Sequence, residues 1–272
     1  MNQIIRLHDQ HLHTKYSLDS KEDLENYYKL TSKLNCSYII TTEHIEFDSV
    51  YNNQDWTVDF DTLKNNLDSL HNKYPSVTPL LGVEVGYRKD HLNDMDKLIS
   101  SEDFDLVNMS IHDNGKYDYY MKKDYEEIGI DKMLDIYFNN AIDGVKTYKN
   151  YDVLSHIDYG FKTAYMLDST LDINNYKHYL KEIFKIVVED DKVLEINFKV
   201  QKTINDINHL KSLLSIYKEC GGTKLSLSSD AHFLAQLDDY YKEQDEFINV
   251  IKDMGFKELY YFIKRKQHKY LI

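Results

Sequence analysis

The sequence predicts an α/β protein whose repeated β–α units close into a barrel. Short apolar or β-branched runs alternate with longer amphipathic stretches along the 272 residues, and this alternation is typical of parallel strands joined by crossover helices. Seven or eight such units favour a closed barrel over an open doubly wound sheet, which stays as the alternative. No Gly/Ser/Pro linker interrupts the chain, so we expect one domain over residues 1–272.

Seven segments have the short apolar character of buried strands. They are residues 4–8, 38–42, 80–85, 106–111, 153–156, 193–197 and 224–228, and a further strand is expected at 259–263. The amphipathic stretches between them predict helices. These are residues 22–34, 60–73, 131–148, 176–189, 205–219 and 244–254. Asn205 is interpreted as a helix N-cap, and Gly221 as the stop of the helix that it begins.

Composition disfavours several classes of function. The formal net charge of −13 is unlike that of a nucleic-acid-binding protein. No apolar run approaches the ~20 residues of a membrane span, and the N-terminus lacks the basic start and apolar stretch of a signal peptide. We therefore expect a cytoplasmic protein that binds neither nucleic acid nor membrane. The two cysteines, Cys36 and Cys220, are expected to be reduced buried thiols.

Metal-binding residue types gather where the predicted strands end. Six of the twelve histidines lie at or just after strand ends, and two carboxylates do the same. These residues are His11, His13, His44, His112, His156, His232, Glu84 and Asp230. In a β/α barrel such positions share one face, where active sites are built. Imidazole and carboxylate together suit Zn, Fe or Mn, so a metal centre is predicted.

The same residues carry a family resemblance. The opening segment DQHLHTKYSLD, residues 9–19, resembles that of the PHP (polymerase and histidinol phosphatase) superfamily. TTEH, GVEVGY, SIH, SHIDYG, LEINFK and SSDAH follow in the family's order. Length and the HTxxSxD start most resemble the stand-alone histidinol-phosphatases. The resemblance implies a distorted (β/α)7 barrel with its metal site at the C-terminal ends of the strands.

The resemblance also implies a ligand set for two or three divalent ions (Zn, Fe or Mn). His11, His13, Glu84 and Asp230 would hold the first ion. Glu84 would bridge to a second, which His112 and His156 also bind. The third would be held by Asp19, His44 and His232.

The activity implied is hydrolysis of a small phosphorylated metabolite, L-histidinol phosphate, in histidine biosynthesis. Asp230 and His232 are the catalytic candidates for assisting the leaving alkoxide, and the general acid stays open. Where family phosphatases often carry arginines, this sequence has Lys162 and Lys202, and Arg88 is a further candidate for binding phosphate. Acidic residues such as Glu46, Asp48 or Asp113 would attract the cationic groups of histidinol.

Other functions remain open from sequence alone. The substrate could be another small phosphomonoester or a phosphotyrosine. A metal-dependent amidohydrolase also uses HxH on a first barrel strand, but it would usually place a lysine where Glu84 stands. A metal-bound regulatory domain without activity is a third interpretation, favoured only if ligands were missing.

Overall fold

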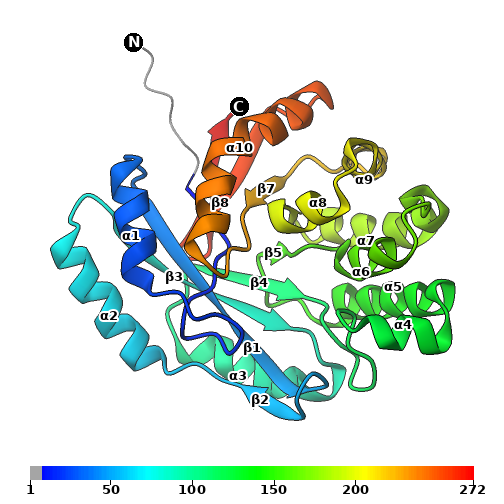
Figure 1. The fold of residues 1–272 in the computed structure, drawn as a ribbon, viewed down its shortest axis with the longest axis horizontal. Helices are drawn as coiled ribbons and strands as arrows, with labels where there is room; N and C mark the ends of the chain where they lie inside the picture. Colours follow the sequence, from blue (N-terminus) through cyan, green and yellow to red (C-terminus); the bar gives the residue numbers. More distant parts are fainter. Residues whose placement is uncertain (1–7) are drawn as a thin grey trace.

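The computed structural model describes residues 8–272. Seven strands form one sheet in the order β2-β1-β3-β4-β5-β6-β7 (Figure 1). Every neighbouring pair is parallel except β1 and β2. The strands are β1 (Tyr38–Ser49), β2 (Gln54–Trp56), β3 (Thr78–Gly86), β4 (Leu106–Ser110), β5 (Val153–Leu154), β6 (Val193–Asn197) and β7 (Leu225–Ser228).

The segment around Leu12 connects β1 to the residues that follow β7. Thr42 of β1 donates its N–H to the Leu12 carbonyl (2.9 Å), and Leu12 forms a parallel bridge with Ala231, just after β7. Hydrogen bonds therefore run around a closed ring, and the fold is the distorted α/β barrel that the sequence predicts. The predicted first strand, residues 4–8, lies outside the described residues except for His8, which is in no strand.

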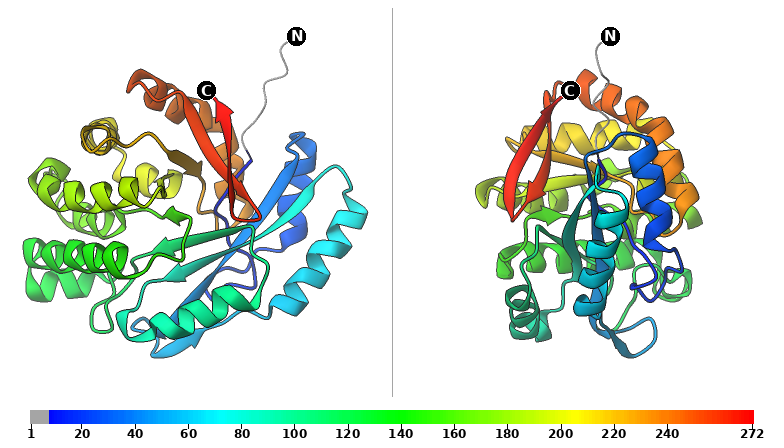
Figure 2. Two further views of the ribbon diagram at one scale, coloured as in Figure 1. Left: turned by 180° about the vertical axis from the view of Figure 1, so that it is seen from behind. Right: turned by 90° about the vertical axis from the view of Figure 1, so that its left-hand side faces the viewer.

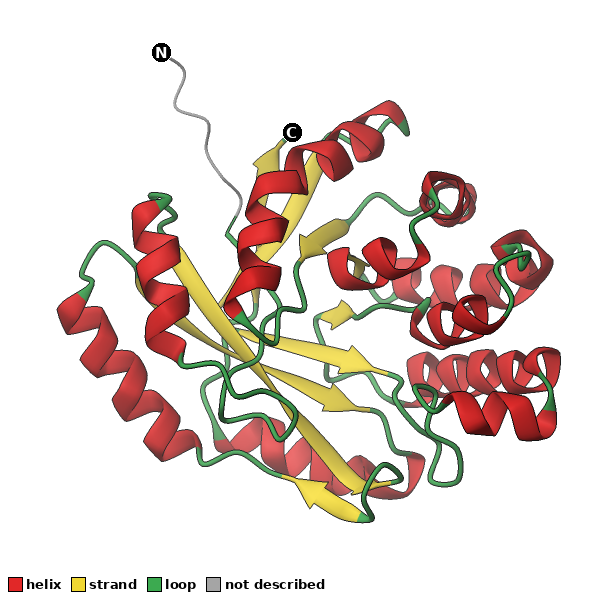
Figure 3. Cartoon of the chain, in the orientation of Figure 1, coloured by secondary structure: helices red, strands yellow, loops and turns green. Residues whose placement is uncertain are grey.

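Helices pack on the outside of this sheet (Figure 3). They are α1 (Leu24–Lys33), α2 (Phe60–Lys73), η1 (Lys89–His91), α3 (Leu92–Ser101), α4 (Lys122–Ile128), α5 (Ile130–Thr147), α6 (Tyr159–Leu167), η2 (Ile173–Tyr176), α7 (Lys177–Glu189), α8 (Phe198–Ile204), α9 (Ile207–Glu219) and α10 (Leu234–Asp253). In α5, Leu134, Phe138, Ala141 and Val145 are buried at the spacing of one helical face. The apolar period that predicted the helices therefore also orients them toward the core.

Several predicted boundaries were wrong: the last helix, α10, begins at Leu234 rather than at residue 244, and two further errors have local reasons. Asn205 does not begin a helix: it has φ 51° and ends α8, and the Asp206 carboxylate caps α9 instead. The strand predicted to end at residue 42 continues to Ser49, because β1 pairs with β3 as far as Ile45 and then with β2. His44 therefore lies within a strand rather than after one.

The C-terminus forms a hairpin of β8 (Glu258–Ile263) and β9 (Lys266–Leu271) outside the main sheet (Figure 2). Phe262 belongs to one apolar cluster with residues near the N-terminal ends of several barrel strands, which are Ile40, Leu80, Leu106, Val153 and Val193. At the tip of the hairpin, Arg265 donates two hydrogen bonds to the Asp152 carboxylate. The hairpin thus covers the N-terminal end of the barrel and leaves the other end for a site. Among residues 8–272, no helix is long and apolar enough to cross a bilayer.

Candidate active site

Glu84 lies at the centre of the predicted ligands, near the C-terminal end of β3, and is fully buried. Its Oε2 is 3.0 Å from His44 Nδ1, 3.1 Å from His11 Nε2 and 3.3 Å from His13 Nε2. Its Oε1 is 2.8 Å from His156 Nε2 and 3.5 Å from His112 Nε2. Imidazoles thus approach both oxygens of one carboxylate, the arrangement of a group that bridges two cations.

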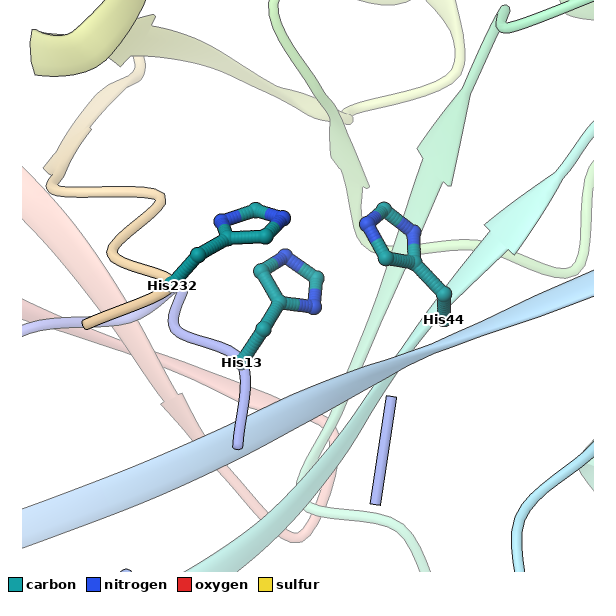
Figure 4. Close-up of side chains that lie close together, drawn as sticks. All are labelled: His13, His44 and His232. Carbon is teal, nitrogen blue, oxygen red and sulfur yellow. The ribbon is translucent and has the colours of Figure 1, made fainter. Parts of the chain in front are cut away.

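The remaining ligands extend this cluster toward the pocket. His13, His44 and His232 turn their rings toward one another (Figure 4), with ring nitrogens within 4.8 Å. Asp19 Oδ2 is 3.0 Å from His232 Nε2 and 3.6 Å from His44 Nε2. Asp230 Oδ1 is 3.4 Å from both His13 Nε2 and His232 Nδ1. The structure therefore brings all nine predicted ligands together, although they come from segments 220 residues apart.

Backbone strain accompanies two of these residues. Asp230 has φ 54° and His156 has φ 20°, a region that residues with a Cβ rarely adopt. Hydrogen bonds hold the strained backbone, since Asp230 N–H donates to His11 O (2.8 Å) and His156 N–H to Glu195 Oε2 (2.8 Å). Such strain concentrates at functional sites.

The donor set fits divalent metal ions. Glu84 Oε2 and His44 Nδ1 lie 3.0 Å apart, and both are buried without any hydrogen bond although further imidazole groups surround them. Buried polar atoms without a partner are costly, and a cation between them would satisfy these lone pairs. Burial alone would raise the pKa of Glu84, but the surrounding imidazoles, His11 foremost, hold it well below its usual value. The central carboxylate is therefore charged and able to bind cations.

Two buried carboxylates outside the predicted set orient the histidines. Glu195 Oε1 lies 2.7 Å from His11 Nδ1, and Glu46 Oε1 lies 2.6 Å from His112 Nδ1. A carboxylate on the second ring nitrogen fixes which nitrogen faces the metal. Glu195 belongs to the LEINFK segment, for which no separate role was predicted, and Glu46 was predicted to attract the substrate. Two features of the sequence could have indicated these roles. Glu46 stands two residues after His44, and Glu195 lies in a predicted strand whose neighbours carry ligands.

A cavity of about 570 Å³ opens above the cluster. Lys162 lines it and is buried, with its ammonium 4.0 Å from the Tyr159 ring centre. Lys199 lines it too, with Nζ 3.0 Å from His232 Nδ1 and 3.4 Å from Asp230 Oδ1. Lys199 was not among the predicted phosphate-binding residues, although it ends the LEINFK segment. Asn197 caps α8 through the Val200 N–H, so Lys199 is held in the first turn beside the cluster.

The other predicted phosphate-binding residues lie elsewhere. Lys202 pairs with Glu243 (2.6 Å) in a separate groove between α8 and α10, because it stands one turn further along α8 than Lys199. Arg88 is buried outside the cavity lining, and its guanidinium bonds to Phe47 O, Asp48 O and Asp113. The structure thus brings Lys162 alone of the three to the pocket.

The six other histidines stay apart from the cluster. His71, His178 and His209 lie in helices, His91 precedes α3, and His268 is in β9. His8 packs among Tyr38, Tyr261 and Tyr270 at the opposite end. These positions match packing or surface roles.

The PHP domain family model matches residues 9–199, which is more than half of the chain. The chain belongs to the PHP family. This PHP protein is 32% identical over 229 residues to a probable histidinol-phosphatase of Clostridium acetobutylicum, covering 83% of this chain and 86% of the relative. It is 25% identical over 268 residues to a histidinol-phosphatase of Lactococcus lactis, covering 96% of each chain.

The PHP fold also recurs in solved structures. A crystal structure of Lactococcus lactis histidinol phosphate phosphatase, in complex with zinc, L-histidinol and phosphate, superposes with a TM-score of 0.84. The match covers 97% of this chain and 99% of the other at 23% identity. The putative histidinol phosphatase of Listeria monocytogenes gives a TM-score of 0.69 at 16% identity, covering 87% and 99%. These likenesses establish the shared barrel over nearly the whole chain.

Proposed function

We propose that this PHP protein is a metal-dependent phosphomonoesterase that hydrolyses L-histidinol phosphate to L-histidinol and phosphate. The observation that carries the proposal is the cluster of nine candidate metal ligands around Glu84, six of which line a cavity together with Lys162 and Lys199. The relatives named as histidinol-phosphatases support the choice of substrate. Such an enzyme would act in the cytoplasm, in the biosynthesis of histidine.

Two or three divalent ions would be held as the family resemblance implies. His11, His13, Glu84 and Asp230 would bind one ion. Glu84, His112 and His156 would bind a second, and Asp19, His44 and His232 a third. Bound ions of this kind lower the pKa of a coordinated water and offset the charge of phosphoryl oxygens. The relative solved with zinc favours zinc, and the same donors accept iron or manganese.

Lys162 and Lys199 would hold the phosphoryl oxygens. Lysine binds phosphate as a point charge without the planar fork of arginine. The two lysines belong to separate helices, α6 and α8, and both line the cavity, so they would supply two point charges in place of that fork. Lys199 also contacts the predicted catalytic residues Asp230 and His232, so it places positive charge where the departing alkoxide would form.

The rest of the cavity suits the leaving group. L-histidinol carries an ammonium and an imidazole, and the cavity is lined by Glu46, Asp113 and Asp118 together with the ring of Trp56. Burial raises the pKa of Asp118 to about 6, which leaves it charged at neutral pH. Acidic groups attract a cation, and an aromatic ring beside them can stack on an imidazole. The chain-wide acidity is thus compatible with an anionic substrate whose other end is cationic.

The test is purification without chelators, quantification of bound metals, and measurement of phosphate release. L-Histidinol phosphate would be compared with phosphotyrosine and other monoesters, with His13→Ala and Glu84→Ala as controls. We expect two to three metals per chain, preference for L-histidinol phosphate, and loss of metal and activity in both variants. Metal with preference for another ester would remove the histidine assignment, and metal without hydrolysis of any ester would overturn the enzyme proposal.

A further inference from the structure

Two loops supply one wall of the cavity. The first, residues 47–56, comprises the end of β1, the turn at residues 50–53 and β2, and the second, residues 113–120, lies between β4 and α4; we refer to both segments as loops. Each contributes polar and aromatic side chains to the lining. We call these residues the pocket wall: Ser49, Tyr51, Trp56, Asp113, Asp118 and Tyr120.

Arg88 joins the two loops from behind. It follows β3, and its side chain is only 10% exposed. Its NH1 donates to Phe47 O (2.8 Å) and Asp48 O (2.7 Å) in the first loop, and to Asp113 Oδ1 (3.2 Å) in the second. Asp113 Oδ2 in turn accepts the N–H of Val50 (3.1 Å). The buried pair of Arg88 and Asp113 therefore fixes the separation of the loops.

The local backbone explains why an arginine is needed. The pairing of β1 with β2 shifts register between Glu46 and Ser49, and Asp48 has φ 47°. A bulge of this kind leaves backbone groups outside the ladder, and the Arg88 guanidinium satisfies two such carbonyls together. Gly115 makes room for it, since a Cβ there would lie 2.9 Å from Arg88 NH2.

We propose that Arg88 is a positioning residue for substrate specificity, which holds the pocket wall in place for the leaving group without touching substrate. The inference rests on the proposed function in one respect, namely that this wall receives the non-phosphate end of a phosphomonoester. It assigns Arg88 a role different from phosphate binding. The three oxygens that its guanidinium contacts all belong to the loops, and it lines no part of the cavity.

Trp56 provides a direct readout, because it is the only tryptophan of the chain and belongs to the pocket wall. In Arg88→Met, the wall loosens and acrylamide should quench Trp56 fluorescence about twofold more strongly than in the wild type, since loss of buried hydrogen bonds increases local opening. This measurement needs no substrate, so its outcome is independent of the phosphatase proposal.

Steady-state kinetics distinguish a role of Arg88 in positioning the pocket wall from a role in binding phosphate. In Arg88→Met, KM for the monoester that the wild type prefers should rise about tenfold with kcat within about threefold, the pattern of lost substrate binding. Inhibition by inorganic phosphate and metal content should stay at wild-type levels. If phosphate inhibition weakens as much as KM rises, Arg88 acts on phosphate and the proposal is overturned.

Arg265→Met is the matched control. Arg265 also forms a partly buried pair with an aspartate, Asp152, but at the opposite end of the barrel. The Arg265→Met variant should have lower thermal stability than the wild type, with unchanged KM and unchanged quenching of Trp56. Arg88→Lys serves if Arg88→Met does not fold, because a lysine side chain ends one bond short of NH1, the single nitrogen that contacts all three oxygens. Unchanged KM and unchanged quenching in the variant that folds would overturn the proposal.

Discussion

Glu195 Oε1 lies 2.7 Å from Nδ1 of His11, and both side chains are buried. The other oxygen of Glu195 accepts the backbone N–H of His156 (2.8 Å), so one carboxylate positions two of the proposed metal ligands. Burial would raise the pKa of Glu195, but the neighbouring His11 imidazole and its hydrogen bonds hold it below the usual value. An ionised carboxylate in this place directs the opposite nitrogen of His11 toward Glu84.

Glu195→Gln should weaken metal binding about 10- to 100-fold, the usual effect of losing such an orienting carboxylate. The amide keeps the size of the side chain but removes the charge that fixes the His11 tautomer. Competition with a chromophoric chelator measures the affinity without any substrate. Glu243→Gln, which changes an exposed carboxylate paired with Lys202, is the control. Equal affinities in the two variants would contradict the role given to Glu195.

Lys199 and Lys202 allow a paired test on one helix. Lys199→Met removes a charge beside His232 and Asp230. It should lower kcat/KM about 10- to 100-fold, the worth of a charged hydrogen bond. Lys202→Met removes a lysine that faces Glu243 in another groove, and we expect a change within about twofold on the same scale. The reverse ranking, from steady-state phosphate release, would restore the assignment made from sequence.

The metal ligands could be predicted from the sequence, but the choice between these two lysines could not. His11, Glu84 and Asp230 could be grouped from sequence because parallel strands of a barrel end on one face, whatever their separation in the chain. The lysine that faces the site could not be identified in this way, because the choice between Lys199 and Lys202 depends on where α8 begins. The Asn197 cap fixes that start, and a helix of seven residues leaves too short an apolar period to detect.

Arg88 failed as a sequence prediction for a different reason. Its closeness to Glu84 along the chain predicted closeness in space, but the guanidinium is taken up by a bulged loop whose carbonyls need donors. A bulge is not visible in the apolar pattern of β1. Likewise the antiparallel β8–β9 hairpin was expected as a single final strand, since its second strand, residues 266–271, has few apolar residues.

The buried ammonium of Lys162 should make kcat/KM depend on pH. Burial, with Lys199 nearby, lowers the pKa of Lys162 from 10.5 to about 8, and bound metal ions would lower it further. The charge that would bind phosphate is therefore lost as the pH rises through a pKa of about 8 or lower, so kcat/KM should fall on the alkaline side. In Lys162→Met this alkaline limb should disappear together with most of the activity. A limb that persists in the variant belongs to another group.

The burial of Lys162 makes stability rise with pH, whereas it makes activity fall. Between about pH 8 and 10.5 the unfolded chain binds more protons at Lys162 than the folded chain, so this residue makes the free energy of unfolding rise with pH in that window. At pH 7 its buried charge costs on the order of 3 kcal/mol. Lys162→Met should therefore melt at a higher temperature than the wild type at pH 7, and a lower melting temperature would contradict this.

Removal of metal should destabilise the protein. Without cations, Glu84 Oε2 and the neighbouring His44 Nδ1 stay buried without hydrogen bonds. Metal at about 100 times its Kd adds roughly 2.7 kcal/mol to the free energy of unfolding, which corresponds to roughly 5–10 °C in a domain of this size. Calorimetry with and without EDTA measures the difference, which should shrink in His13→Ala. Equal melting temperatures of the metal-loaded and stripped wild type would argue against a metal centre.

Gly86 gives the sharpest test of how the cluster is supported. A Cβ at Gly86 would lie 1.7 Å from Glu46 Oε2, so Gly86→Ala must displace the carboxylate that bonds to His112 Nδ1. We expect about 1–3 kcal/mol of lost stability from overpacking and weaker metal binding. Gly222→Ala, whose Cβ would lie 2.5 Å from the Tyr217 ring, should destabilise the fold without affecting metal.

The double variant separates crowding from orientation. Combining Gly86→Ala with Glu46→Ala removes the clash, so stability should recover relative to Gly86→Ala alone, a coupling expected only for residues in contact. Metal affinity should not recover, because His112 still lacks its carboxylate. Unfolding in denaturant and chelator competition measure the two quantities separately. Recovery of both would mean that Gly86 matters only for packing, and that Glu46 does not position His112.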